Sequence, residues 1–133
     1  MKTSLSAMLA LMILSCTLSC GKGGGSTPSE TALAITTNPP NGSTQTPAPG
    51  TSFPLTVTIT SKMPSKGVTI DVTAQPDGGG TQFFSSSQSS SQAVNNYTIT
   101  NTPVAKVCVV TVTVTSLSQS SNTATSSYRF SAK

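Results

Sequence analysis

Few residues in this chain have side chains that could carry out chemistry. The sequence contains no histidine, and its three acidic residues are Glu30, Asp71 and Asp77. General acid–base catalysis requires a positioned proton donor and acceptor, and a transition-metal site requires histidines or several thiolates. Serine is so abundant that no single serine stands out as a nucleophile. The composition therefore predicts a protein that is not an enzyme and that holds no metal or other cofactor.

The cysteines lie in two different settings. Cys108 alternates in phase with Val110 and Val112, and this pattern predicts a buried, unreactive thiol. Cys16 and Cys20 instead lie at the end of an apolar stretch near the N-terminus. This N-terminal pair contains the candidate site for attachment of a lipid.

Residues 1–19 have the organisation of an export signal. Lys2 supplies a positive charge, and an apolar stretch follows from Leu5 to Leu18. The stretch is shorter than the roughly 20 apolar residues that span a bilayer comfortably, and it fits the core of a signal peptide. We therefore predict an exported protein. The alternative to a lipoprotein signal is an ordinary secretory peptide cut nearby, or a retained anchor helix.

The segment Leu18–Lys22, with sequence LSCGK, resembles a lipobox of the Bacteroidetes type. In a lipobox the cysteine thiol accepts diacylglycerol. The resemblance implies a lipoprotein signal peptide at residues 1–19, a lipidated Cys20, and an outer-membrane location facing the periplasm or the cell surface. Cys16 is the alternative lipidation site, because Thr17 occupies the position where a lipobox before Cys20 usually carries leucine.

The segment after Cys20 differs in composition from the rest of the chain. Residues 21–31 (GKGGGSTPSET) contain no apolar side chain, which predicts a flexible linker. Its r.m.s. reach is on the order of 18 Å. The predicted organisation is a signal peptide at 1–19, a lipidated cysteine and linker at 20–31, and one folded domain at 32–133.

The folded domain shows an alternation of apolar and polar residues that is typical of half-buried strands. Turn-forming residues interrupt it about every ten positions, which predicts an all-β fold: a single immunoglobulin-like antiparallel β-sandwich of about seven strands. Residues 85–92 (SSSQSSSQ) are predicted to form a low-complexity loop. The expected strand segments are 33–35, 53–59, 68–73, 83–84, 94–99, 108–115 and 128–130.

The last third of the chain resembles a bacterial Ig-like domain. The resemblance rests on Tyr97–Ile99, Val107–Thr115 and Ser121–Phe130, and the turn Asn38–Ser43 is similar to the Pro-x-x-Gly turn of that family. It covers roughly residues 32–133 and implies a sandwich fold in an envelope or surface setting. It carries over no functional residues, because Ig-like domains have many unrelated roles. The tryptophan of antibody domains is absent from the sequence.

Phe83 and Phe84 are the candidate binding residues. Adjacent residues of a strand point to opposite faces of a sheet. We therefore expect one ring to fill the core and the other to be exposed beside the serine-rich segment. An exposed aromatic ring at this position could contact a protein or a glycan; burial of both rings is the alternative.

These patterns predict a general class of function and do not identify a particular ligand or partner. The net charge of +4 comes from scattered residues and forms no basic stripe, so we expect no nucleic-acid partner. A tethered sandwich without a catalytic constellation indicates a non-catalytic interaction module, held at the membrane by its N-terminal lipid and docking to another envelope or surface protein. The alternative is a surface carbohydrate-binding or adhesive module, and a self-associating spacer is a third interpretation.

Overall fold

The computed structural model describes residues 29–133. The predicted signal peptide and both candidate lipidation sites, Cys16 and Cys20, lie outside the described residues. The described part contains no helix that is long and apolar enough to cross a membrane. It forms seven strands: β1 (Ile35–Asn38), β2 (Phe53–Ile59), β3 (Val68–Pro76), β4 (Phe84–Ser90), β5 (Val94–Ile99), β6 (Val107–Ser116) and β7 (Thr123–Ser131).

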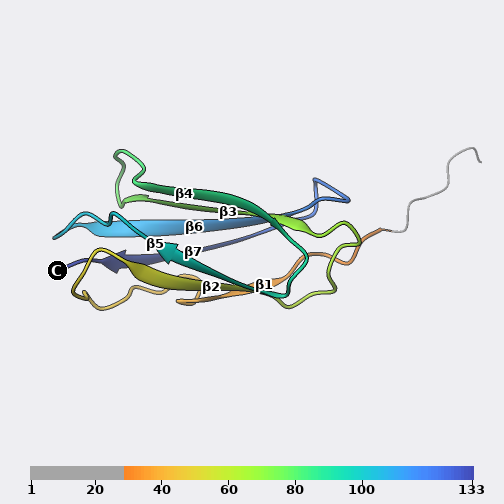
Figure 1. Ribbon diagram of the computed structural model, residues 1–133, viewed down its shortest axis with the longest axis horizontal. Coiled ribbons are helices and arrows are strands. Elements are labelled where there is room, and N and C mark those ends of the chain that lie inside the picture. Colours follow the sequence, from red (N-terminus) through yellow and green to blue (C-terminus); the bar gives the residue numbers. More distant parts are fainter. Residues whose placement is uncertain (1–28) are drawn as a thin grey trace, which may run out of the picture.

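The strands form two antiparallel sheets that pack face to face (Figure 1). One sheet has the order β1-β2-β5 and the other has the order β4-β3-β6-β7. The predicted all-β fold, a single antiparallel β-sandwich of about seven strands, is confirmed. In the constant-type Ig arrangement the fourth strand belongs to the first sheet. Here β4 pairs with β3 instead, so that the second sheet has four strands.

The two sheets enclose one hydrophobic core. On β6, Val110, Val112 and Val114 are fully buried, while the threonines between them face outward. Burying a side chain of this size contributes about 1.5–3 kcal/mol relative to leaving it exposed. Phe53 of β2 and Phe130 of β7 meet edge to face, with ring centroids 4.8 Å apart. A slip of one residue would turn the valines of β6 to solvent, so burial specifies the register.

Residues 42–48 cover the free edge of β7. A Pro-Pro pair follows β1, and because proline cannot donate to a sheet ladder, the chain leaves the three-stranded sheet there. The next residues run parallel to β7. The Gly42 N–H donates to the Ser127 carbonyl at 2.7 Å, and the Gln45 N–H donates to the Arg129 carbonyl at 2.8 Å. The N-terminal part of the domain therefore satisfies the outer backbone groups of β7.

The serine-rich segment is a strand rather than a loop. The prediction of a loop at residues 85–92 is wrong, because β4 pairs with β3 over seven register positions. Gly78–Gly80 all have positive φ, which lets the chain reverse between these two strands. Serine has little intrinsic preference for strands, so the available backbone edge of β3 decides the outcome. β1 begins at Ile35, two residues later than predicted.

Tyr97 and Tyr128 both point into the core, as the alternation predicts, with 8% and 2% of their surfaces exposed. Their hydroxyl groups are buried without hydrogen-bond partners. Burial raises the pKa of Tyr128 to about 12. Burial, and to a lesser extent the charge of Asp71, also raises the pKa of Tyr97. The core therefore contains two phenols that strongly favour their neutral forms.

We expect Tyr128→Phe to raise the free energy of unfolding by about 1 kcal/mol at neutral pH, because it removes a buried polar group without breaking a hydrogen bond. Urea unfolding measures this change. A loss of stability would show that the hydroxyl has a partner, such as a buried water.

The same variant should alter the pH dependence of stability. The pKa of Tyr128 is raised from 10.0 to about 12 by folding, so the unfolded chain loses its proton first. The contribution of the neutral Tyr128 hydroxyl to the free energy of unfolding is complete below pH 10, and it is lost as the pH rises to about 12. Wild type should therefore lose stability more steeply than Tyr128→Phe across this window. Equal slopes for the two proteins would contradict the prediction.

Candidate functional site

The two phenylalanines singled out in the sequence lie on the same side of the sheet. Phe84 is the register partner of Ala74, and the Phe83 N–H donates to the Ala74 carbonyl at 3.0 Å. Phe83 and Phe84 on one strand thus both lie opposite Ala74 on the other, as in a β-bulge. Both rings are half-buried and pack against the core. The expectation that one ring is exposed is therefore wrong. A role for either ring in binding stays a prediction.

Cys108 is fully buried, which confirms the prediction from its phase on β6. Burial raises the pKa of its thiol, and the nearby charge of Lys106 opposes this effect only in part. A thiol in this environment is a poor nucleophile. Within residues 29–133 no three side chains of the histidine, cysteine, aspartate or glutamate type come together as a metal site.

The two aspartates do not combine into a catalytic pair. Asp77 forms an ion pair with Arg129, with 2.7 Å between Oδ2 and Nε. Both side chains are exposed to a large extent, so this pair is screened by solvent. Asp71 lies on the outer face of β3, where its register partners are Ser87 and Thr113. The geometry therefore offers no pair of carboxylates for acid–base chemistry in the described part of the chain.

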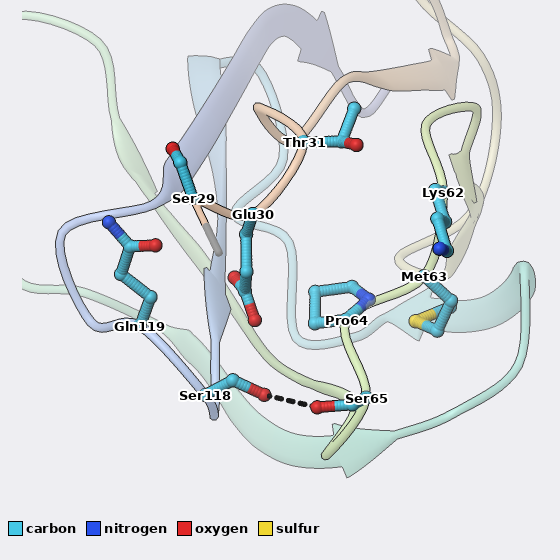
Figure 2. A pocket seen from close by; sticks show the side chains of 9 residues that line it. All are labelled: Ser29, Glu30, Thr31, Lys62, Met63, Pro64, Ser65, Ser118 and Gln119. Carbon is cyan, nitrogen blue, oxygen red and sulfur yellow. Dashed lines mark hydrogen bonds between the residues drawn. The ribbon is translucent and has the colours of Figure 1, made fainter. Parts of the chain in front are cut away.

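A pocket of about 730 Å³ lies at the end of the sandwich where the N-terminal segment enters. Figure 2 shows that the N-terminal segment, the β2–β3 loop and the β6–β7 loop form its walls. The hydroxyls of Ser65 and Ser118 are 3.1 Å apart and bond to each other rather than to a general base. The lining residues are Ser29, Glu30, Thr31, Lys62, Met63, Pro64, Ser65, Ser118 and Gln119.

Glu30 joins this pocket to the β6–β7 loop. Its Oε2 accepts a hydrogen bond from Asn122 Nδ2 at 3.1 Å, while its Oε1 is buried without a partner in hydrogen-bond geometry. The hydroxyl of Ser116, followed by the Asn122 amide, lowers the pKa of Glu30. A carboxylate with a lowered pKa is a weak base at neutral pH. Glu30 therefore acts as a structural contact, within the segment that the sequence assigned to the linker.

Asn122 is a residue that the sequence did not single out. Its Oδ1 accepts a hydrogen bond from the Leu33 N–H at 2.8 Å, and its Nδ2 also donates to the Thr31 carbonyl at 3.0 Å. These partners are 89 and 91 residues away along the chain. Because no local pattern encodes such contacts, only the tertiary structure identifies Asn122 as the residue that fixes the entry of the chain into the sandwich.

We expect Asn122→Ala to lower the free energy of unfolding by about 1–3 kcal/mol, because it leaves the Leu33 N–H without its partner. Asn96→Ala is the matched control, since its side chain accepts one exposed hydrogen bond, from Thr56. The control should change stability by less than about 0.5 kcal/mol. Urea unfolding gives both values, and amide hydrogen exchange at Leu33 should accelerate in Asn122→Ala alone. Equal effects of the two substitutions would contradict this role.

The outer edge of β4 is the second candidate site. The Asp77 N–H donates to the Val107 carbonyl at 2.8 Å, so the odd-numbered residues of β3 direct their backbone groups toward β6. Successive residues of a strand bond to opposite neighbours, so the even-numbered residues of β3 bond to β4. Their register partners on β4 are also even-numbered. The backbone N–H and C=O groups of Ser85, Ser87 and Ser89 therefore point away from the sheet.

This edge differs from the edges formed by β7 and β1. Residues 42–48 cover the β7 edge, and β1 has only four residues and is followed by two prolines. In the described part of the chain, no backbone hydrogen bond reaches the outer side of β4. Residues 78–105, which include both β4 and β5, contain no charged side chain. Natural proteins usually protect edge strands with charges, proline or a cover, and β4 has none of these.

Comparisons with protein-family models, with curated proteins and with solved structures gave no match for this chain. What the geometry defines is a class: an all-β sandwich with a pocket at one end and an uncovered strand along one side.

Proposed function

We propose that this protein is a lipid-anchored, non-catalytic interaction module of the bacterial cell envelope, which docks to another envelope or surface protein. The lipid on Cys20 holds the domain at the outer membrane, and the linker sets its distance from the bilayer. The domain itself supplies the contact surface. No nucleic acid, metal or cofactor takes part.

The observation that carries this proposal is the open side of the sandwich formed by β4 and β5. A strand edge without cover or charge is a template for pairing with another chain. Residues 78–105 supply such a side without charged groups that would repel a partner or need to be desolvated. The catalytic alternative lacks comparable support, because Glu30, Asp71 and Asp77 serve separate structural contacts or lie apart.

Lipid attachment can be tested directly in cells. After labelling with radioactive palmitate, Cys20→Ser should lose the label, because it removes the thiol that accepts the lipid. Cys16→Ser is the matched control and should keep the label. Loss of label in Cys16→Ser alone would move the anchor to Cys16, and absence of label in the wild type would refute the anchor.

Docking can be tested by site-specific photocrosslinking in intact cells. A photoreactive amino acid at Ser91, which is exposed directly after β4, should form one defined adduct with another protein. The same probe at Thr125, exposed on β7 at the other edge of this sheet, should not form that adduct. An adduct formed equally from both positions, or from neither, would contradict the proposal. Selective binding of the full chain to one class of sugar on a glycan array would favour the carbohydrate alternative.

A further inference from the structure

Asn41 and Gly42 form the one Asn-Gly pair in the sequence. In such a pair the backbone nitrogen of the second residue can attack the side-chain amide carbon of the asparagine and close a five-membered succinimide ring, and asparagine is accordingly among the thermolabile residues. Glycine favours the attack, because it has no Cβ and little restriction of its backbone. Both residues are exposed at the turn after β1, where water reaches them. The pair is therefore a candidate site of deamidation.

The reaction at this pair is complete with water as the only co-reactant. The bond between Gly42 N and Asn41 Cγ forms, the bond between Cγ and Nδ2 breaks, and Nδ2 leaves as ammonia with the Gly42 amide proton. Water then hydrolyses the succinimide at either of its two carbonyl groups. One product carries an aspartate at position 41. In the other product, isoaspartate, the main chain runs through Cβ and Cγ and is longer by one atom.

The fold ties both reacting groups to Ser127 of β7. The Ser127 N–H donates to Asn41 Oδ1 at 2.8 Å, and the Gly42 N–H donates to the Ser127 carbonyl at 2.7 Å. The Ser43 N–H donates to the Pro40 carbonyl at 3.2 Å and Gly42 has a φ of +74°, as in a type II turn. Ring closure needs the peptide plane between Asn41 and Gly42 to turn toward the carboxamide, and this movement breaks the hydrogen bond from Gly42 to Ser127. The native pairing therefore opposes the reaction.

Residues 42–48, the cover segment, are held on β7 mainly by main-chain hydrogen bonds. The Gln45 N–H donates to the Arg129 carbonyl at 2.8 Å, and the Ala48 N–H donates to the Ser131 carbonyl at 3.2 Å. Within the described chain, none of the buried core residues belongs to the cover segment. Segments with few buried apolar contacts open locally at a lower free energy than the whole domain. The cover segment can therefore detach from β7 while the sandwich stays folded.

We infer that Asn41 is a deamidation site that is protected while the cover segment lies on β7 and reacts when the segment detaches. This inference is independent of the proposed docking function. The aspartate product retains an oxygen that can accept the Ser127 N–H. The isoaspartate product places one additional atom between residues 41 and 42, so Gly42 loses its register with Ser127. Deamidation by this route leaves the edge of β7 permanently less well covered.

The first test compares the folded and unfolded full-length protein. Deamidation at Asn41 is followed by peptide mass spectrometry during incubation in mildly alkaline buffer, with and without denaturing urea. We expect the folded protein to react at least about tenfold more slowly, because it reacts only from the minor population with a detached cover segment. Equal rates would overturn the protection by the fold, and absence of reaction in urea would overturn the assignment of the site.

Two substitutions at Gln45 test the cover segment itself. Gln45→Pro removes the N–H that donates to Arg129, whereas the matched control Gln45→Ala keeps this N–H and removes the side-chain hydrogen bond to Ser43. In the folded protein, Gln45→Pro should raise the rate of deamidation by about tenfold, because the segment detaches more often. Gln45→Ala should stay within about twofold of wild type. Equal rates for the two variants would contradict the role of the cover segment.

Urea unfolding checks that both variants fold, and hydrogen exchange in the wild type provides the measurement if Gln45→Pro does not. The Ser127 N–H faces the cover segment, while the N–H of its neighbour Ser126 faces β6, because successive strand residues bond to opposite neighbours. Exchange at Ser127 should be at least about tenfold faster than at Ser126, since detachment of the cover segment frees only the Ser127 N–H. Equal exchange at the two residues would show that the segment detaches only when the whole domain unfolds, and would overturn the inference.

Discussion

The antiparallel pairing of β3 with β6 sets the direction of every backbone group in the four-stranded sheet. Nine register pairs join these two central strands, from Val68 with Ser116 to Pro76 with Cys108. Each pair places a side chain of β3 and one of β6 on the same face. Most residues of the buried face are fully enclosed aliphatic side chains and Cys108, so a slip by one position would expose most of this layer at once. The hydrophobic core thus determines which backbone groups remain free at the sheet edges.

The two edges of this sheet, β7 and β4, differ in whether their outward backbone groups have hydrogen-bond partners. At β7, the segment that follows β1 crosses from the other sheet and forms parallel hydrogen bonds, so the edge is closed by the protein itself. At β4, the ladder ends with serines whose outward groups have no partner among the described residues. The sequence composition follows this division, because charged side chains are absent from 78–105 but occur at both ends of that range. An interaction surface along β4 is consistent with this asymmetry.

The end of the sandwich where the chain enters has a mainly structural role. Asn122 bonds to three groups of the entering segment, at Glu30, Thr31 and Leu33. These contacts hold the first residues of the domain beside the β6–β7 loop and create one wall of the pocket. These contacts of Asn122, the Asn122 clamp, therefore fix the end of the sandwich at which the described chain enters.

The amino-acid sequence by itself determined the class of fold and most of the core. The two-residue alternation in β2, β3 and β6 identifies the buried residues, including Cys108, because side-chain direction in a strand is a local property. The strand character of the serine-rich segment, the shared orientation of Phe83 and Phe84, and the clamp at Asn122 were decided only by tertiary structure. Each depends on a partner distant along the chain or on the register of a neighbouring strand, and neither is encoded in local composition.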